Sequence, residues 1–145
     1  MTVTIRPMTL ADYGVVMALI QGVPGVVVRS ADTIDAVERY LARNPELSMV
    51  AVDRGRLIGC VFCGHDGRRG YLNHVVVYTD YRRQGIGSAL VEAALDALAS
   101  IGIFKSHLEV LTDNKEAIAF WNHTGWQKRD DIFRFSYNRS PDPNA

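Results

Sequence analysis

The sequence lacks several features that would point to particular classes of function. Its 16 basic residues are balanced by 16 acidic residues, so no broad positive charge is present to attract nucleic acid or an anionic membrane. No run of 18 apolar residues occurs, which argues against a membrane-spanning helix. The first residues do not combine a charged region with an apolar one, so we expect no signal peptide. We therefore expect a cytoplasmic protein with no nucleic-acid partner and no membrane partner.

Cysteine is also scarce, and the two that occur, Cys60 and Cys63, are separated by two residues. Such a pair could serve redox chemistry or half of a zinc site, but no second pair completes that site. The segment 57–63 reads as a strand, in which residues three apart point to opposite faces. We expect two buried, unreactive thiols and no metal ion.

The order of elements predicts one α/β (α+β) domain over residues 1–138, followed by a flexible tail over residues 139–145. The 48% of hydrophobic residues are enough for one core. Turn residues at 54–55 and 66–67 favour an antiparallel meander, and a right-handed crossover would place the next strand parallel to the third strand of the meander. The expected first part is a strand over 3–6, a helix ending near 21, and a helix capped by Ser30 or Asp32 and ended by Asn44-Pro45. Three strands should follow, over 48–53, 56–64 and 70–78. The expected last part is a helix over 86–101, a strand over 107–111, a helix that Asp113 or Asn114 caps and that ends near 124, and one or two strands within 126–137.

A glycine-rich loop, Arg82-Arg83-Gln84-Gly85-Ile86-Gly87, lies between a predicted strand and a predicted helix. A helix N-terminus offers unpaired N–H groups and partial positive charge, and glycines let an anion approach the backbone. The P-loop for nucleotides is excluded because no Gly-Lys pair follows. The dinucleotide fingerprint lacks its third glycine, since Leu90 stands there. A glycine turn without a ligand remains the structural alternative.

Two motifs resemble the GNAT (GCN5-related) N-acetyltransferases. The first is Arg82-x-x-Gly85-x-Gly87 after the strand 72–77, which resembles the coenzyme A signature of that family. The second runs from Leu108 to Trp126 and includes Asn114-x-x-Ala117-x-x-Phe120-Trp121, which resembles the family's closing segment. The order of elements also agrees with the GNAT fold, a mixed and mostly antiparallel sheet with a splayed parallel strand pair.

The resemblance implies direct transfer of an acetyl group from acetyl-CoA to a primary amine of a small molecule or protein. It implies that acetyl-CoA is a co-substrate, that no metal takes part, and that a homodimer is a possible assembly. The alternative is an acyl-CoA-binding sensor with little or no catalysis. The residues implied in coenzyme A binding are Val75, Val76, Val77, Arg82, Arg83, Gln84, Gly85, Ile86, Gly87, Ser88, Asn114, Ala117, Phe120 and Trp121.

The catalytic groups are harder to assign. Trp121 stands where the family usually has a tyrosine as general acid, and an indole N–H is not an acid of useful pKa. Tyr71 and Asn73 occupy strand positions where relatives carry a base, and strand parity places both on the face of Val75 and Val77. Parity places His74 on the opposite face, as a packed or capping residue.

His65, at the end of the middle meander strand, is a further candidate base, whereas His107 and His123 look peripheral. The apolar stretch 22–29 is either an acceptor-binding segment or buried core. The sequence does not identify the acceptor.

Overall fold

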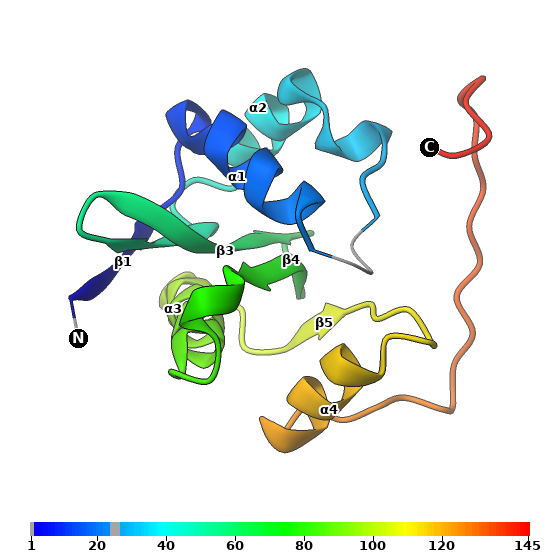
Figure 1. The fold of residues 1–145 in the computed structure, drawn as a ribbon. Helices are drawn as coiled ribbons and strands as arrows, with labels where there is room; N and C mark the ends of the chain where they lie inside the picture. The colour runs from blue at the N-terminus through cyan, green and yellow to red at the C-terminus, as the bar shows by residue number, and fades with distance from the viewer. Residues whose placement is uncertain (1, 24–26) are drawn as a thin grey trace.

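The computed structural model describes residues 2–23 and 27–145, which form a five-stranded sheet with helices on both faces (Figure 1). The strands are β1 (Val3–Pro7), β2 (Met49–Asp53), β3 (Arg56–His65), β4 (Gly70–Val77) and β5 (Ser106–Leu108). The helices are α1 (Tyr13–Gln21), α2 (Ile34–Arg43), α3 (Ile86–Ser100) and α4 (Lys115–His123), with short 3₁₀ turns at Leu10–Asp12, Ser30–Asp32 and Thr79–Tyr81. The predicted mixed sheet flanked by helices is confirmed.

The strand order is β1-β2-β3-β4-β5, and each pair is antiparallel except β4–β5, which is parallel. Arg54 and Gly55 join β2 to β3 with φ angles of 51° and 80°. Two successive left-handed residues are what a tight hairpin with the natural strand twist requires. The predicted meander and the parallel crossover through α3 are both confirmed.

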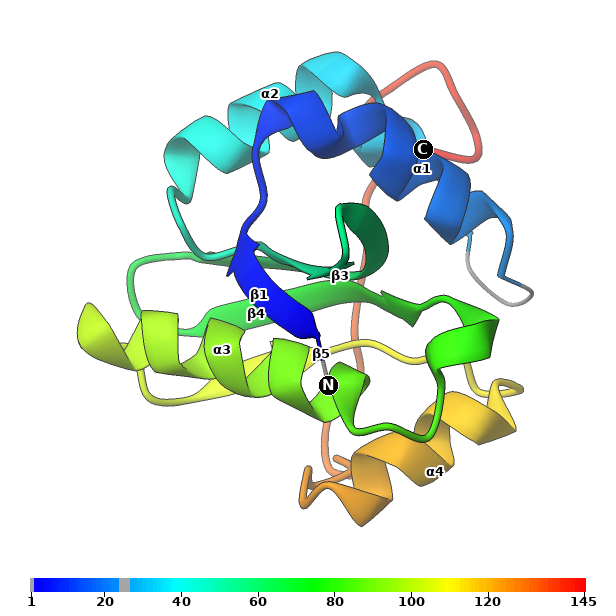
Figure 2. The same cartoon turned by 60° about the vertical axis from the view of Figure 1, so that its left-hand side comes forward.

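Two hydrophobic layers cover the two faces of the sheet. Figure 2 shows the helices above them, with α3 on one side of the sheet and α1 and α2 on the other. One layer packs α3 on the sheet through Leu90, Ala94 and Leu98, and the other packs α1 and α2 on the opposite face. Cys60 belongs to the α1–α2 layer and Cys63 to the α3 layer, as strand parity predicts. Both thiols are free, and burial raises the pKa of each to about 12.

The caps of two helices were only partly predicted. Thr33, not Ser30 or Asp32, caps α2, since its hydroxyl accepts a hydrogen bond from the Ala36 N–H at 3.3 Å. Asp32 instead closes the preceding 3₁₀ turn by accepting from the Arg29 N–H at 2.8 Å. Asn114 caps α4 as expected.

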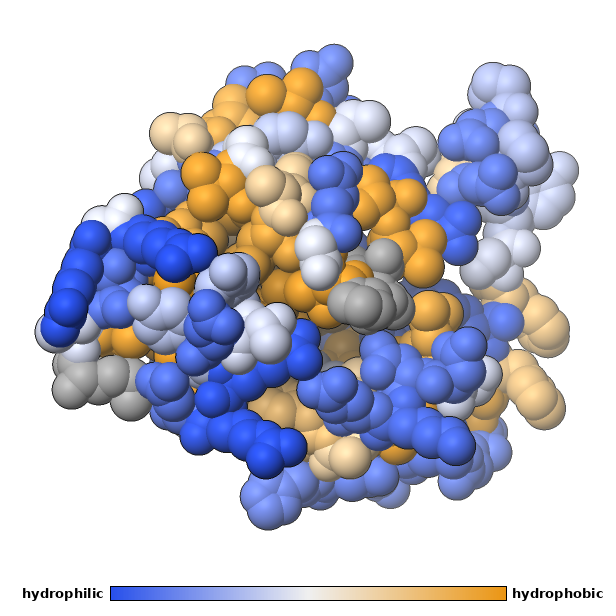
Figure 3. All heavy atoms as spheres, in the orientation of Figure 1, coloured by the Kyte–Doolittle hydropathy of each residue, from blue (hydrophilic) through white to orange (hydrophobic). Residues whose placement is uncertain are grey.

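The prediction of one or two strands within 126–137 is wrong for this structure. From Trp126 onward the described chain forms no helix and pairs with no strand, and nearly all of it is exposed. Figure 3 shows hydrophobic residues at the right-hand edge of the molecule, where this C-terminal segment runs in Figure 1. A strand-like pattern shows that a segment can pair as a strand. Whether it does so depends on a free strand edge elsewhere in the sheet, which the local sequence does not reveal.

Among the described residues, no helix is long and apolar enough to cross a bilayer. Within the same residues, no three His, Cys, Asp or Glu side chains gather in a way that could hold a metal ion.

Candidate active site

The parallel strands β4 and β5 pair over only three residues. The pairs are Gly70 with Ser106, Tyr71 with His107, and Leu72 with Leu108. β4 continues for five more residues, to Val77, without a neighbour on that side. The edge of β4 beyond Leu72 therefore presents backbone groups that an extended ligand can pair with.

A β-bulge interrupts β4 next to this opening. Cys60 of β3 faces Val76 and Phe62 faces Asn73, so His74 and Val75 together oppose a single β3 residue. His74 takes the left-handed φ of 49°. The extra residue breaks the alternation of side chains along β4. Residues after the bulge therefore lie on the face opposite to the one that simple alternation from Tyr71 and Asn73 predicts.

The reversal corrects the predicted faces of β4. Asn73, opposite Phe62, lies on the α1–α2 face, whereas Val75 and Val77 pack in the α3 layer. Tyr71 shares the face of Asn73 because it lies two residues before it in the regular part of the strand. His74 also lies on the α1–α2 face, where its ring meets the edge of Phe62. The prediction that Tyr71 and Asn73 share a face with Val75 and Val77 is therefore wrong. His74 does lie opposite Val75 and Val77 as a packed residue, as predicted, but it shares the face of Tyr71 and Asn73.

His74 connects the bulge to the turn before α2. Its Nε2 lies 2.9 Å from Oδ1 of Asp32, and both side chains are largely buried. The Tyr13 hydroxyl donates to the Asp32 carbonyl at 2.7 Å. Burial raises the pKa of Asp32, but hydrogen bonds from His74 and the Arg29 N–H outweigh it and leave the pKa below its usual value. Asp32 is therefore a carboxylate at neutral pH, held by groups from three segments.

A small cavity of about 30 Å³ lies where β4 and β5 separate. Tyr71 and His107 line it with their ring centroids 5.9 Å apart, and Glu109 and Arg134 close it. Sequence reasoning treated His107 as peripheral and did not single out Glu109 for this site. The β4–β5 register, which sequence spacing does not give, places both beside Tyr71.

The other predicted base, His65, does not reach this cavity. His65 pairs with Gly70, and a Cβ on Gly70 would meet Leu98 of α3, so His65 lies toward the α3 face. Its Nδ1 accepts from the Gly67 N–H at 2.9 Å within the β3–β4 turn. Of the acceptor segment expected over 22–29, residues 24–26 lie outside the described residues, while Val27 and Val28 are exposed.

The glycine loop leads directly into α3. Arg83 and Gly85 both have left-handed φ angles, 62° and 76°, and Gly85 is the N-cap. The first helical hydrogen bond runs from the Ala89 N–H to the Gly85 carbonyl at 3.0 Å. The N–H groups of residues 86–88 precede that bond and have no intrahelical partner. A Cβ at Gly85 would meet nothing within 4 Å, so the backbone there is open to an approaching group.

Helix α4 forms the other wall beside this loop (Figure 2). The Phe120 ring lies 3.5 Å from where a Cβ of Gly87 would be. Arg82 bridges the two sides, since its Nε lies 3.4 Å from the Val77 carbonyl and its Nη1 lies 3.1 Å from Glu116 Oε1. The Asn114 amide oxygen accepts from the Ala117 N–H at 3.1 Å, so it caps α4 as the structural alternative predicted.

Trp121 is packed rather than exposed to a reacting group. Its ring meets the Phe120 ring at 4.8 Å and the Trp126 ring at 5.1 Å, edge to face in both cases. It also contacts the α3 layer of the core. A tryptophan so placed packs α4 against the α3 layer and offers no ionisable proton.

The chain therefore offers the two features that a coenzyme A thioester requires. The open N–H groups at the start of α3 suit a pyrophosphate, and the unpaired β4 edge suits an extended amide-containing arm. The two lie at consecutive positions along the chain, because the loop directly follows β4. The residues present fit the ligand.

Comparison with known proteins agrees with this geometry. The model of the acetyltransferase (GNAT) family matches residues 17–126. N-alpha-acetyltransferase 30 of Schizosaccharomyces pombe is 34% identical over 108 residues, which are 70% of this chain and 72% of that protein. The crystal structure of Ard1 from Thermoplasma volcanium superposes with a TM-score of 0.74 at 27% identity, covering 86% of this chain and 82% of that one.

The structure of the NatC complex bound to Gag peptide and CoA superposes with a TM-score of 0.71 at 25% identity. That match covers 86% of this chain and 84% of the other. Members of the GNAT family use acetyl-CoA as the acetyl donor. The chain thus belongs to the GNAT acetyltransferase family and is an acetyl-CoA-dependent N-acetyltransferase.

Proposed function

We propose that this chain acetylates the α-amino group at the N-terminus of a polypeptide. The observation that carries the proposal is the 34% identity with a protein named N-alpha-acetyltransferase 30. The similarity to a complex that was solved with a peptide and CoA supports the same class of acceptor.

The chemistry of the site favours an α-amine over a lysine side chain. With a pKa near 7.7, roughly one α-amine in six is neutral at pH 7, whereas roughly one lysine in 2,500 is. β4 carries Tyr71 and Asn73 at the positions expected for a base, and neither is a carboxylate. An acceptor amine that is already partly neutral depends less on a base to remove its proton, so a weak base is sufficient.

We propose that the donor lies along β4 and ends at the α3 N-terminus. The N–H groups of residues 84–88 would bind the pyrophosphate, with Arg83 adding positive charge. The backbone of Val75, Val76 and Val77 would pair with the extended arm, opposite Ala117 and Phe120 of α4. Arg82 and Asn114 would hold the two walls, because the structure shows them bridging and capping α4.

Acetyl-CoA would supply the acetyl thioester at the bulge, where the chain's own groups act on it. The Val75 N–H would donate to the carbonyl oxygen as negative charge develops there. Tyr71, on the α1–α2 face, would accept or relay the amine proton, and Asn73 would position a water molecule. A thiol with a pKa near 8.5 leaves without strong acid assistance, so Trp121 need not donate a proton.

The donor site is tested with Gly87→Glu. A carboxylate at this position would repel the pyrophosphate and enter the space beside Phe120, so acetyl-CoA binding measured by calorimetry should be lost. Ala99→Glu adds the same charge at the exposed far end of α3 and should bind normally. Unchanged affinity in Gly87→Glu would refute the placement of the pyrophosphate.

The acceptor is tested by thiol release with two matched peptides. One peptide has a free N-terminus and no lysine, and the other has a blocked N-terminus and one lysine. Acetylation of the first alone, with the site located by mass spectrometry, is the expected result. Modification only of lysine, or only of small amines, would overturn the α-amine assignment while leaving the donor site intact.

A further inference from the structure

His74 has a backbone conformation that few side chains adopt. Its φ of 49° is left-handed, and a residue other than glycine keeps such a φ only where its surroundings hold it. The imidazole makes two contacts that do so. Its ring meets the edge of the Phe62 ring, with 5.7 Å between the centroids, and its Nε2 lies 2.9 Å from Oδ1 of Asp32. The side chain of His74 therefore fixes the backbone of the bulge.

Asp32 is the hydrogen-bond acceptor in this contact. It is a carboxylate at neutral pH and has no proton to donate, so the hydrogen lies on Nε2 of His74. The other carboxylate oxygen, Oδ2, accepts from the Arg29 N–H at 2.8 Å, and the Asp32 carbonyl accepts from the Tyr13 hydroxyl at 2.7 Å. One residue thus holds together the bulge, the end of the segment 22–29 and helix α1.

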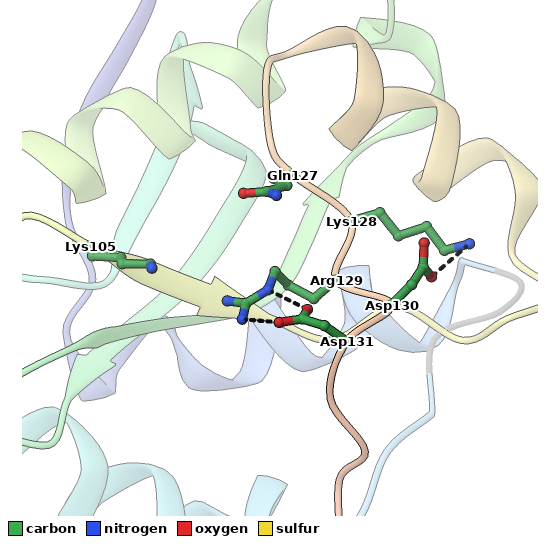
Figure 4. Close-up of a pocket in the computed structure, with 6 residues that line it drawn as sticks. All are labelled: Lys105, Gln127, Lys128, Arg129, Asp130 and Asp131. Carbon is green, nitrogen blue, oxygen red and sulfur yellow. Dashed lines mark hydrogen bonds and ion pairs between the residues drawn. The ribbon is translucent and has the colours of Figure 1, made fainter.

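This contact differs from ion pairs at the surface of the molecule. Figure 4 shows two of these within residues 128–131, each between residues two positions apart and beside an open cleft. Exposed pairs of this kind fix little, because water and salt screen them. The side chains of His74 and Asp32 are only 18% and 10% exposed, and the two residues are 42 positions apart. Their hydrogen bond therefore fixes two distant parts of the chain relative to each other.

We propose that His74 and Asp32 form a positioning pair for acetyl transfer, in which their hydrogen bond holds the bulge so that the Val75 N–H points at the carbonyl oxygen of the donor. The inference rests on the proposed binding of that carbonyl at Val75. The Val75 N–H lies in the peptide plane that joins it to His74, so the backbone angles of His74 decide where it points. Both residues act through the backbone, and neither touches the reacting atoms.

The direction of this N–H matters more for the rate than for binding. A hydrogen-bond donor stabilises a developing oxyanion only when it is already in place, and a misplacement of about 1 Å can lower the rate about 10²-fold. Without the contact to Asp32, residue 74 can relax toward a negative φ, and the peptide plane before Val75 turns with it. Coenzyme A should still bind, because its pyrophosphate and extended arm are placed at the glycine loop and along the rest of β4.

His74→Gly tests the pair, since glycine takes a φ of 49° freely but lacks the imidazole. Thiol release at saturating acetyl-CoA, with whichever amine the acceptor test selects, should show a kcat about 10- to 100-fold lower. The affinity for coenzyme A, which has no acetyl carbonyl, should be unchanged by calorimetry. His74→Gln, whose amide can donate to Asp32, should recover most of the loss. Arg54→Gly makes the same kind of change at a φ of 51° in the β2–β3 turn and should keep the wild-type kcat.

Infrared spectroscopy of bound acetyl-CoA tests the geometry without an acceptor. A hydrogen bond from the Val75 N–H weakens the C=O bond of the thioester and lowers its stretching frequency. With carbon-13 at the acetyl carbonyl, the band of the bound donor should move to higher frequency in His74→Gly and return toward the wild-type position in His74→Gln. This readout remains decisive even where the acceptor is not an α-amine.

Asp32→Ala removes the same hydrogen bond from the other side and covers the case in which His74→Gly does not fold. It should lower kcat to a similar degree in a chain that circular dichroism shows to be folded. The double variant should be no slower than the slower single variant, because the two residues act as one unit.

Four results would overturn the proposal. They are a wild-type kcat in either folded single variant, an unmoved carbonyl band in His74→Gly, losses of the two single variants that multiply in the double variant, and a loss of coenzyme A affinity as large as the loss of kcat. The last would show that His74 only supports the fold of the donor site. Failure of the donor placement itself shows separately, as normal acetyl-CoA binding in Gly87→Glu.

Discussion

The Nε2 of His74 lies 2.9 Å from the Oδ1 of Asp32, and this contact joins the bulge of β4 to the turn before α2. Asp32 follows the segment expected to bind the acceptor, and His74 directly precedes Val75, where the donor carbonyl is proposed to bind. The contact therefore connects the two sides on which the two substrates would approach.

Replacing Asp32 by Asn should make the stability of the protein less dependent on pH in acid. The folded pKa of Asp32 lies below its unfolded value of about 3.9, so its stabilisation is full above that value and is lost as the pH falls through the folded pKa. The loss at neutral pH should be on the order of 1 kcal/mol.

Thermal melting of the wild type and of Asp32→Asn between pH 3 and pH 7 measures this effect. The difference in Tm should be constant above about pH 5 and should shrink below about pH 4. Asp96→Asn, at an exposed position on α3, should show no Tm difference from the wild type over this range. A difference for Asp32→Asn that is as large at pH 3 as at pH 7 would contradict the prediction.

The two loop glycines should respond differently to alanine. Gly85 has a φ of 76°, where a Cβ costs about 1–2 kcal/mol, although the space around it is open. Gly87 lies inside α3 without a left-handed φ, and its Cβ would make an ordinary contact with Phe120. Urea unfolding should show a clear loss for Gly85→Ala and none for Gly87→Ala. An equal loss of unfolding free energy in the two variants would mean that the left-handed backbone of residue 85 is not the cause.

Trp121→Phe should retain most of the turnover. A general acid contributes about 10²–10⁴-fold, so removing one would be obvious, whereas loss of an indole should change kcat less than about tenfold. The phenyl ring keeps part of the edge-to-face contact with Trp126. Steady-state thiol release at saturating donor measures this, with circular dichroism as the folding control. A hundredfold fall in kcat in a folded variant would give the indole a direct role.

Neither cysteine should react in the native protein. Burial raises the pKa of Cys60 and Cys63 to about 12, so almost no thiolate forms at pH 8, and the thiolate is the reactive species. A disulfide reagent such as Ellman's should label two thiols in guanidinium and none in the native chain. Rapid labelling of one thiol without denaturant would show that its strand opens.

Sequence reasoning located the fold and the loop because both depend on local patterns. The turn at Arg54-Gly55 and the Gly85 cap follow from short-range backbone rules. The bulge at His74 does not follow from such rules. Parity assumes that each residue of one strand faces one residue of the next strand, and no residue type around His74 marks the extra residue. His107 was missed for a related reason, since its nearness to Tyr71 depends on the register between strands 36 residues apart.

The unpaired strand over 126–137 shows a different limit. Aromatic and polar residues alternate over 133–137, yet the structure forms none of the strands expected within 126–137. Whether such a segment pairs is decided by an edge elsewhere, in the same chain or in another.

The short pairing of β4 with β5 also divides the molecule into parts of unequal stability. β1 to β4 form an antiparallel sheet, with β2 to β4 as its meander, that is covered on both faces, whereas β5 is attached by three residue pairs. In the free protein, β5 and α4 should open as a local unit while the meander stays folded, and their amide hydrogens should exchange first. A molecule that binds along β4 would then hold β5 and α4 to the more stable strands β1 to β4.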